Sequence, residues 1–540
     1  MSNAFFQVPV AENEPVRNYE PGSAERESLL NTYRELYNGH IDVTSVIGGE
    51  YIKSDNQKDL TPPHDHQHKI GTAHFVGEKE VKQAVDAALA AKPAWEKMPW
   101  QDRAAIFLRA ADLLSGPWRD RLNASTMLAQ SKNVHQAEIE AACEFADFLR
   151  FNVEFMTQIY EEQPLSPDGM WNRMEHRALE GFVFAISPFN FTAIAGNLPM
   201  APALMGNTVV WKAADSQLFS AYFVMELFRA AGLPDGVINL VVADGPTAGD
   251  VIFNHRDFAG LHFTGSTGVF RHLWKTIGNN IEKYRTYPRI VGETGGKDFV
   301  AVHKSSNAQQ VAANLIRGSF EFQGQKCSAA SRAYIPENLW PEVKEHLIRM
   351  AGEITVGTPE DTNNYVNAVI DERAFDKIAG YIDFLNESDA DVIVGGSYDK
   401  SKGYFVQPTI AVSPDPMSKT MVEEIFGPVL TIYVYPSDEW EATLDLVDST
   451  SEYALTGAIF SNDRYATLYA IDKLRHAAGN FYINDKPTGA VVGQQPFGGS
   501  RGSGTNDKAG SILNLLRWTS PRTMKETFNP VSDFKYPFLG

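Results

Sequence analysis

The spacing of apolar residues along the chain changes at Gly181. Before that point, apolar residues recur every three or four positions over 78–98 and 101–116, which predicts two amphipathic helices. The second pattern stops at Gly116 and Pro117, a pair of residues that commonly ends helices. Beyond Gly181, short apolar runs alternate with helical segments. This alternation predicts an α/β protein with a doubly wound parallel sheet and helices on both of its faces.

The short apolar runs form two groups, which indicates two α/β domains in a chain too long for one hydrophobic core. The first group of expected strands covers residues 182–187, 208–213, 237–242, 260–265 and 289–294. The second group covers residues 333–336, 391–396, 427–436 and 456–461. The segments 161–181 and 507–540 are too short and aromatic to fold alone, so we expect strands there that pair across a subunit interface.

One stretch without a charged residue, 181–211, is long enough to cross a membrane. Three prolines interrupt it, and its pattern fits a buried strand, a loop, a buried helix and a second strand better. The formal net charge of −19 argues against nucleic-acid binding, because phosphate contacts need clustered Lys and Arg side chains. We therefore expect neither a membrane nor a nucleic acid as partner.

The N-terminal region gives an expectation for the cellular compartment. It lacks a basic segment followed by an apolar one, so we expect no secretory signal. It is also too acidic for a transit peptide. With so few cysteines, the sequence predicts a cytoplasmic (bacterial) protein, or one of the mitochondrial matrix if a leader has been removed.

The chain has two cysteines, Cys143 and Cys327, and their wide separation makes a disulfide framework a poor interpretation. Cys143 lies in a helical stretch, where cysteine packs as a small buried hydrophobe. Cys327 stands between Lys326 and Ser328, and a neighbouring cation favours the thiolate, the nucleophilic form of cysteine. Cys327 is therefore a candidate nucleophile, with a plain packing role as the alternative.

Four of the expected strands end in short motifs rich in small or polar residues. The motifs are SPFNF at 187–191, GNTVVWKAAD at 206–215, FTGSTG at 263–268 and GETGGK at 292–297. Because ligands bind beyond the carboxyl ends of parallel strands, the four motifs together predict a binding site. The small residues of FTGSTG would let a phosphate approach the start of the following helix. Each motif alone is weak, since strand ends often use glycine simply to turn.

Three other sequence patterns do not indicate a functional site of the kind they first suggest. His64, His66 and His68 lie in a polar loop without a supporting set of ligands, so we expect no metal there. Ser500 lies in GGSRG, but a nucleophile elbow with that spacing needs a strand running into the serine, and QQPF precedes it instead. The fingerprint G-x-G-x-x-G does not occur, so a dinucleotide would have to bind through other contacts.

With the segment around Cys327, these motifs resemble the aldehyde dehydrogenase superfamily, from about residue 40 to the end of the chain. Glu293 and Cys327 lie 34 residues apart, as the general base and nucleophile of that family do. Asn190, EEIFGPV and PFGG also match active-site segments of the family. Four longer stretches are most similar to its Δ1-pyrroline-5-carboxylate dehydrogenase branch, in the monofunctional form. These stretches cover residues 186–207, 320–332, 479–510 and 516–528.

The resemblance implies a fold of three parts: a Rossmann-type NAD-binding domain, an α/β catalytic domain and a small β arm for oligomerisation. It places the NAD-binding domain at 1–158 and 182–296, the catalytic domain at 297–506, and the arm at 159–181 and 507–540. It further implies a homodimer joined through the C-terminal arm.

The implied reaction is the NAD-dependent oxidation of L-glutamate γ-semialdehyde, which arises from Δ1-pyrroline-5-carboxylate, to L-glutamate in proline degradation. Cys327 would attack the aldehyde to give a thiohemiacetal and then a thioester. Asn190 and the Cys327 backbone N–H would hold the oxyanion, and Glu293 would activate the water that cleaves the thioester. The glycines after Glu293 would let its side chain swing aside for the cofactor.

The resemblance also implies which residues contact the two ligands. The implied cofactor contacts are Ile186, Ser187, Pro188, Phe189, Lys212, Gly265, Ser266, Glu424 and Phe426. The implied substrate contacts are Phe191, Ser328, Gly489, Ala490 and Phe497. Glu144 is a candidate partner for the substrate ammonium, with a structural carboxylate as the alternative. Asp215 stands where many members have Glu, and a carboxylate near the ribose favours NAD over NADP.

Three alternatives stay open at this point. A dehydrogenase for another small semialdehyde, such as succinic semialdehyde, would need no ammonium site. A CoA-acylating enzyme would not need a water activator of its own, which Glu293 supplies. A scaffolding descendant of the family would have no reason to keep Cys327, Glu293 and Asn190 together.

Overall fold

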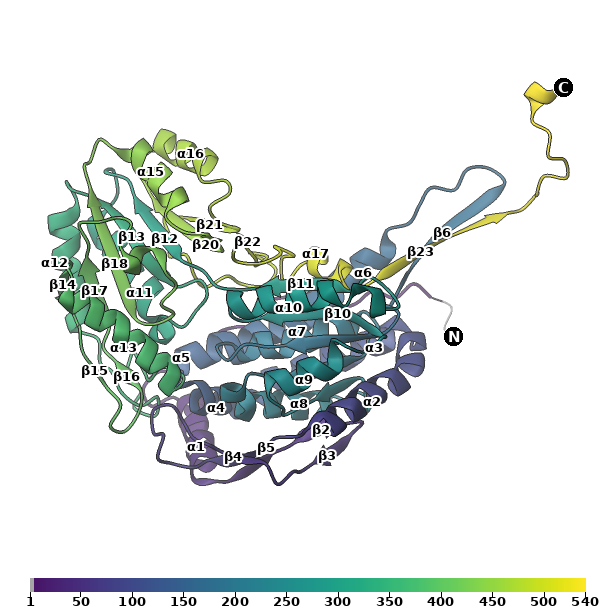
Figure 1. Ribbon diagram of the computed structural model, residues 1–540, viewed down its shortest axis with the longest axis horizontal. Helices are drawn as coiled ribbons and strands as arrows, with labels where there is room; N and C mark the ends of the chain where they lie inside the picture. Colours follow the sequence, from purple (N-terminus) through teal and green to yellow (C-terminus); the bar gives the residue numbers. More distant parts are fainter. Residues whose placement is uncertain (1–3) are drawn as a thin grey trace.

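Two seven-stranded sheets form the framework of the computed structural model, which describes residues 4–540 (Figure 1). Residues 1–3 of the expected NAD-binding domain lie outside the described residues. The strand order is β11-β10-β7-β8-β9-β2-β3 in the first sheet and β14-β17-β18-β13-β12-β20-β21 in the second. Helices cover both faces of each sheet, so the predicted α/β class is confirmed, although both sheets are mixed rather than wholly parallel.

All five strands expected between residues 182 and 294 are present and parallel to one another. They are β7 (Phe182–Ile186), β8 (Val209–Lys212), β9 (Ile238–Leu240), β10 (Phe258–Thr264) and β11 (Arg289–Glu293). The hairpin of β2 (Ser45–Ile47) and β3 (Glu50–Ile52) extends the sheet in the antiparallel sense, which the apolar pattern did not predict. Its strands have only three residues each, too few for an alternation of apolar and polar side chains to be recognised.

Side chains of the first sheet alternate between two cores, as the period of a strand requires. Val183 and Ala185 pack with α7 and α8, whereas Phe182 and Phe184 pack on the other face with α2 and α9. The charge-free stretch 181–211 folds as β7, α7 and β8, as predicted. In the described part of the chain, no helix is long and apolar enough to span a membrane. The helices of this region are α2 (Glu78–Lys97), α3 (Trp100–Ser115), α4 (Arg119–Gln130), α6 (Phe145–Glu161), α7 (Thr192–Leu204), α8 (Leu218–Ala230), α9 (Gly245–Ile252) and α10 (Thr267–Asn279).

The second sheet contains all four strands of the second predicted group and three that the pattern missed, β12, β17 and β21. Its strands are β12 (Asp298–Val302), β13 (Ala330–Pro336), β14 (Asp391–Val394), β17 (Thr409–Val412), β18 (Val429–Tyr435), β20 (Thr456–Phe460) and β21 (Asn480–Ile483). Helices α11 and α12 cover one face, and α15 and α16 cover the other. The helices are α11 (Ala308–Phe320), α12 (Trp340–Gly352), α13 (Glu372–Glu387), α14 (Lys419–Val422), α15 (Trp440–Ser449) and α16 (Arg464–Lys473).

The N-terminal region adds helices and a three-stranded sheet to the first core. Its elements are α1 (Ala24–Asn38), β1 (Ile41–Val43), β4 (Gln57–Leu60), β5 (Gly71–His74) and α5 (Val134–Ala137). Between α5 and α6 the chain forms a π-helical turn, Glu138–Glu144, a local widening that often occurs near functional sites. Cys143 lies in this turn and is buried, as predicted.

The arm is a two-stranded antiparallel ribbon of β6 (Met170–Arg177) and β23 (Ser520–Thr527), which projects from the body of the protein (Figure 1). We expected these strands to pair across a subunit interface, but within one chain they pair with each other. The buried Trp518 fixes the root of the arm, since its ring lies 4.7 Å from the His262 ring of β10. The remaining short elements are β15 (Tyr398–Asp399), β16 (Phe405–Val406), β19 (Tyr453–Ala454), β22 (Ser500–Arg501) and α17 (Ile512–Leu516).

Candidate active site

Four adjacent strands of the first sheet end at one edge. Their order in the sheet is β11, β10, β7 and β8, and all pair in parallel. At the ends of these strands Glu293 pairs with Thr264, Phe263 with Ile186, and Ile186 with Lys212. The four motifs that follow these strands in the sequence therefore lie side by side, at the edge where parallel sheets bind ligands.

Cys327 reaches this edge from the second sheet, on the connection between α11 and β13. The turn before it is left-handed at Phe322, Gln323 and Gly324, with φ of 49°, 53° and 65°. Phe322 and Gln323 are almost completely buried, which holds them in a conformation unfavourable for side-chain-bearing residues. At Gly324 a Cβ would lie 2.4 Å from the Gly427 carbonyl oxygen, so only glycine fits.

Gly295 and Gly296 allow three segments to meet beside Cys327. A Cβ on Gly295 would lie 2.4 Å from the Glu424 carboxylate, and one on Gly296 would lie 2.2 Å from the Cys327 carbonyl oxygen. The Gly296 N–H donates to Glu424 Oε1 at 3.0 Å. Neither glycine has a positive φ. In this structure the two glycines allow close approach of neighbouring segments, and the mobility of Glu293 that we expected from them stays a prediction.

Asn190 lies in the loop between β7 and α7 and is buried. Its Nδ2 donates to the Gln325 carbonyl oxygen at 3.1 Å, two residues before Cys327. Its own carbonyl oxygen accepts a hydrogen bond of 2.6 Å from Lys132 Nζ. The Asn190 amide is thereby held against the segment that carries the cysteine.

Lys132 and Glu140 hold this loop in place, and no sequence pattern singled them out. Lys132 Nζ pairs with Glu140 Oε1 at 2.8 Å, and both side chains are buried. Glu140 Oε2 accepts the Ala193 backbone N–H at 3.0 Å, at the start of α7. Burial lowers the pKa of Lys132 to about 8, although Glu140 opposes the shift. The charged pair thus fixes the approach of the chain to Asn190.

Glu293 occupies the last position of β11 and is partly buried. Burial raises the pKa of its carboxyl to about 8, with Lys508 lowering it and Asp507 adding to the increase. A carboxyl that ionises near this pH is suited to take a proton from water, because general bases work best near the operating pH.

The thiol of Cys327 does not have the environment that we expected from its neighbour Lys326. Lys326 Nζ pairs with Glu321 Oε2 at 3.1 Å, and both side chains are buried. Burial raises the pKa of Cys327 well above its usual range, and the carboxyls of Asp298 and Glu293 add to the increase. The expectation that Lys326 stabilises the thiolate was therefore wrong for the ligand-free chain, because Glu321 already neutralises this cation.

A cavity of about 450 Å³ opens above Cys327 and Glu293. The residues that we expected to contact substrate all line it: Phe191, Ser328, Gly489, Ala490 and Phe497, together with Glu144. Ser328 Oγ is hydrogen-bonded to Thr488 Oγ1 at 2.8 Å, which joins the cysteine segment to the loop at 488–495. Burial raises the pKa of Glu144 to about 8, with Glu140 adding to the increase and Lys132 opposing it.

The residues expected to hold a dinucleotide are not among those that line this cavity. Lys212 Nζ, at the end of β8, pairs with Asp215 Oδ1 at 3.0 Å. Ser266 is the N-cap of α10, and its Oγ accepts the Val269 backbone N–H at 3.4 Å. A Cβ on Gly265 would lie 2.8 Å from the Phe263 ring, so the chain passes closely there. A lysine, a helix N-terminus and a glycine beside it are groups that fit ribose hydroxyls and a pyrophosphate.

The nicotinamide end of such a cofactor would meet residues from both sheets. The rings of Phe189 and Phe426 meet edge to face at 5.8 Å, and Phe426 has a positive φ of 61°. Glu424 is held by the Gly296 N–H, as described above. Ile186, Ser187 and Pro188 belong to the same loop, where Ser187 Oγ accepts the Trp211 indole N–H at 3.0 Å. The loop after β7 and the segment 424–426 therefore meet here, while the cofactor role of the nine residues stays a prediction.

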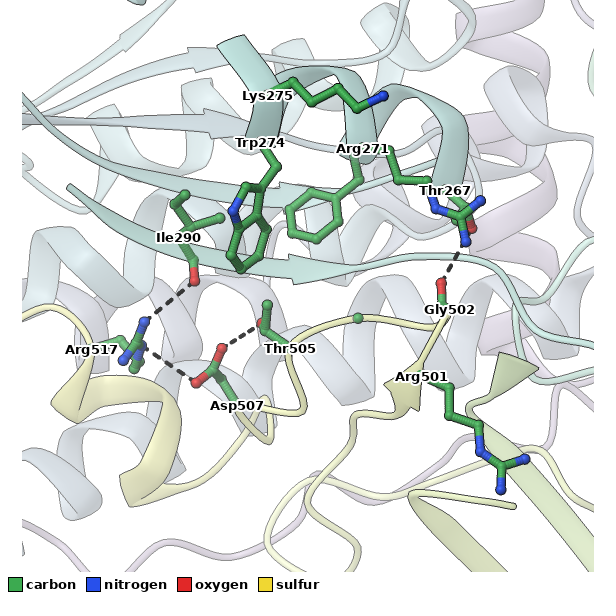
Figure 2. A pocket seen from close by; sticks show the side chains of 12 residues that line it. Thr267, Arg271, Trp274, Lys275, Ile290, Arg501, Gly502, Thr505, Asp507 and Arg517 are labelled. Carbon is green, nitrogen blue, oxygen red and sulfur yellow. Dashed lines mark hydrogen bonds and ion pairs between the residues drawn. The ribbon is translucent and has the colours of Figure 1, made fainter. Parts of the chain in front are cut away.

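The segment 501–507, in the Gly-rich stretch after PFGG, fixes the strand that carries Glu293 (Figure 2). The Thr505 N–H and hydroxyl both donate to the Gly292 carbonyl oxygen, and the Thr294 hydroxyl donates to the Gly502 carbonyl oxygen at 2.6 Å. In Figure 2 Arg517 reaches both Asp507 and the Ile290 carbonyl oxygen. The only sequence signal for this segment is its Gly, Ser and Thr content, which indicates a loop but not the strand that the loop contacts.

The patterns that we set aside have structural partners. His64 is buried against Tyr33 and Ser131. His66 Nε2 donates to the Lys400 carbonyl oxygen at 2.9 Å, and His68 Nε2 donates to the Tyr37 carbonyl oxygen at 2.6 Å. Ser500 lies in β22, which pairs with β19. The three histidines thus face different parts of the protein.

Comparisons with known proteins agree with this geometry. A sequence profile described as "Aldehyde dehydrogenase family" matches residues 51–524. This chain belongs to the aldehyde dehydrogenase family. A Dictyostelium discoideum protein named "Delta-1-pyrroline-5-carboxylate dehydrogenase, mitochondrial" is 51% identical over 541 residues, which cover 99% of this chain and 97% of that protein. The human protein of that name is 46% identical over 529 residues, covering 98% and 94%.

A solved structure matches this member of the aldehyde dehydrogenase family over its whole length. It is the crystal structure of the Δ-pyrroline-5-carboxylate dehydrogenase from Mycobacterium tuberculosis bound with NAD. The TM-score is 0.97 at 53% sequence identity, and the match covers 100% of both chains. Aldehyde dehydrogenase architecture is thereby established for this chain.

The raised pKa of Cys327 predicts slow alkylation of the ligand-free enzyme. Iodoacetamide should react slowly near neutral pH, and the rate should rise about tenfold for each pH unit, because only the thiolate reacts. Mass spectrometry of the peptide that contains Cys327 measures the rate. A Cys327→Ala variant is the control, since Cys143 is buried with a raised pKa and should stay unlabelled. Rapid labelling that is independent of pH would contradict the described environment.

Proposed function

We propose that this chain oxidises L-glutamate γ-semialdehyde, the open form of Δ1-pyrroline-5-carboxylate, to L-glutamate with NAD as the electron acceptor. One observation carries the proposal: Cys327, Glu293 and the loop at 488–490 line a single cavity. The cavity therefore offers a nucleophile and a base at one place and an anchor for the far end of the substrate at another. The names of the relatives and the NAD-bound structure support the same reaction, which belongs to proline degradation.

In this mechanism the Cys327 thiol loses its proton to solvent, and the resulting thiolate adds to the aldehyde carbon and forms a thiohemiacetal. Asn190 Nδ2 uses one hydrogen for the Gln325 carbonyl, so its second hydrogen is available for the oxyanion, beside the Cys327 backbone N–H. NAD, when bound, supplies the acceptor for the hydride that the substrate loses. The product on the protein is a Cys327 thioester.

Glu293 completes the reaction by taking a proton from the water that attacks the thioester carbonyl. Hydrolysis then releases L-glutamate and restores the Cys327 thiol. The segment 501–507 holds the strand of Glu293, so the carboxyl is directed from a fixed backbone. Hydrolysis by its own base distinguishes this chain from a CoA-acylating enzyme.

The two charged groups at the far end of the substrate need partners inside the cavity, because buried charges are costly without them. For the α-carboxylate we propose the Ser328 hydroxyl and the backbone N–H groups at Gly489 and Ala490. For the α-ammonium we propose Glu144, whose carboxyl lines the same cavity. Phe191 and Phe497 would enclose the methylene chain between the two ends.

The Asp215 carboxylate explains the choice of NAD over NADP. Asp215 lies 3.0 Å from Lys212 Nζ, the group expected to contact the adenosine ribose. A 2′-phosphate placed there would be repelled by the neighbouring carboxylate. Lys212 would thus keep its ribose contact, while Asp215 excludes the additional phosphate.

The substrate assignment is tested by following NAD reduction with three aldehydes. Δ1-Pyrroline-5-carboxylate should be turned over with a kcat/KM at least about tenfold above those of succinic semialdehyde and propanal, which lack one or both charged groups. The Cys327→Ala variant should lose all three activities. Equal values for the three aldehydes would keep the thioester mechanism and reject the amino-acid substrate. A preference for succinic semialdehyde would favour the alternative dehydrogenase.

Replacing Glu293 by Gln should separate hydride transfer from hydrolysis. The variant should release about one equivalent of reduced cofactor per site and then stop as a stable thioester, because the base is missing. In the wild type, the rate of thioester hydrolysis should rise with pH and level off above about pH 8, the pKa of Glu293. Rapid-quench mass spectrometry measures the acyl-enzyme. Continued turnover by the variant would assign the base elsewhere.

The same pKa predicts a change in stability. The pKa in the folded chain lies above the usual glutamate value of 4.5, so folding favours the protonated form and the wild type loses stability between about pH 4.5 and pH 8. The Gln variant lacks this loss, so its melting temperature should rise relative to the wild type over that range. Glu282→Gln, on an exposed residue, is the matched control and should follow the wild type.

For the assembly we propose a homodimer joined through the arm. The ribbon of β6 and β23 projects from the body with both outer strand edges unpaired among the described residues, and Trp171 on it is 49% exposed. Open strand edges and exposed aromatic side chains favour association. Light scattering should give twice the chain mass of 59.9 kDa. A monomer at all concentrations would reject the proposal.

For the compartment we propose the bacterial cytoplasm or the mitochondrial matrix. Relatives from Dictyostelium discoideum and human are named mitochondrial. Fractionation of the source cells, followed by activity with Δ1-pyrroline-5-carboxylate, distinguishes the two. Activity in a secreted fraction would reject both.

A further inference from the structure

The N-terminal segment 11–19, here called the strap, has an irregular conformation and contributes to the wall of the cavity that Cys327 lines. Asn13, Glu14 and Val16 of the strap belong to the cavity wall. The strap has no strand or helix partner, so side chains of the body must satisfy its backbone groups. Those side chains show how it is held.

Three carboxylates of the body accept backbone N–H groups of the strap. The hydrogen bonds join Ala11 to Glu154 at 2.7 Å, Glu14 to Asp147 at 2.7 Å, and Arg17 to Glu138 at 2.8 Å. They recur at every third strap residue, and the carboxylates lie on α6 and on the π-helical turn before it. Hydrogen bonds to charged acceptors are the stronger kind, so the strap is fixed along its length.

The Glu14 side chain adds a second attachment. Its two oxygens pair with Arg119 at 2.5 Å and with Arg150 at 2.8 Å. Arg119 is itself buried and also pairs with Glu138. The strap therefore completes a network of buried charges, which makes it part of the folded body.

Asn13 connects the strap to the loop at 488–495. Its Nδ2 donates to Asp147 Oδ2 at 2.8 Å and to the Val492 carbonyl oxygen at 2.8 Å. Its Oδ1 accepts the Gln494 side-chain amide at 3.0 Å. The Asn13 side-chain amide thus uses both of its hydrogens and its oxygen to join the body, the strap and the loop. These three hydrogen bonds are here called the clasp.

The loop is held at its other end by the hydrogen bond between Thr488 and Ser328, beside Cys327. Between the two attachments it contains Gly489 and Gly493, with φ of 94° and 83°. Glycines in this conformation leave the backbone free to rearrange when an attachment is lost. The position of the loop therefore depends on Asn13 as well as on Ser328.

We propose that Asn13 is a positioning residue for substrate specificity: through its clasp on Val492 and Gln494, the strap sets where the loop at 488–490 meets the far end of the substrate. This inference rests on the proposed function of that loop as the anchor of the amino-acid end. The binding of a substrate too short to reach the loop does not depend on Asn13. A substrate that reaches the loop is bound less tightly when the hydrogen bonds of Asn13 are lost.

The test compares Asn13→Ala with Glu12→Ala, a neighbouring exposed strap residue. In Asn13→Ala the KM for Δ1-pyrroline-5-carboxylate should rise about tenfold, the value for one lost positioning hydrogen bond, while kcat and the KM for NAD stay within about twofold. The kcat/KM for propanal should stay unchanged. Glu12→Ala should match the wild type in all four measurements.

Hydrogen exchange of the peptide 488–495, without any ligand, gives a second and independent measurement. Exchange should be faster in Asn13→Ala than in Glu12→Ala. Equal exchange, or an equal loss of activity with propanal and with Δ1-pyrroline-5-carboxylate, would overturn the inference. A wild type without preference for Δ1-pyrroline-5-carboxylate would instead overturn the proposed function, while the exchange measurement would still report whether Asn13 holds the loop.

Discussion

The passage of Gly295 and Gly296 between Cys327 and Glu424 is the contact on which the active site depends. The proposed nucleophile belongs to the second sheet and the proposed base to the first, and the chain crosses from one sheet to the other at these glycines. A single Cβ at Gly296 would lie 2.2 Å from the Cys327 carbonyl oxygen and would push the two sheets apart. Because reacting groups must be placed within fractions of an ångström, this crossing sets the geometry of both proposed catalytic steps.

Buried charges surround that crossing, and their number distinguishes this site from an apolar core. Lys132 and Glu140 form a pair behind Asn190, and Lys326 and Glu321 form another beside Cys327. Buried ion pairs add little net stability, since desolvation offsets their attraction. Their effect here is positional and electrostatic: the first pair fixes the loop of Asn190, and the second removes the cation that would otherwise favour the thiolate.

The wall of the proposed substrate cavity is built from segments that lie far apart in the sequence. Asn13 contacts Val492 across 479 residues of sequence, and Thr488 contacts Ser328 across 160. A wall built from such distant segments forms only when the whole chain has folded. The same arrangement allows one strap residue to influence substrate binding without contact with the reacting carbon, because the loop transmits its position.

The sequence by itself determined the strands around 182–294, the helix of the charge-free stretch and the motifs at four strand ends, because apolar periodicity and small residues are local signals. It did not reveal the hairpin of β2 and β3, whose strands are too short to carry a period. It also gave a wrong environment for Cys327, since the partner that neutralises Lys326 is set by folding. Three contacts were decided by the tertiary structure alone. They are the pairing of β6 with β23, the packing of segment 501–507 beside Glu293, and the hydrogen bonds of Asn13. Each of them joins segments far apart in the chain, and no spacing within one segment specifies which distant group will satisfy its hydrogen bonds.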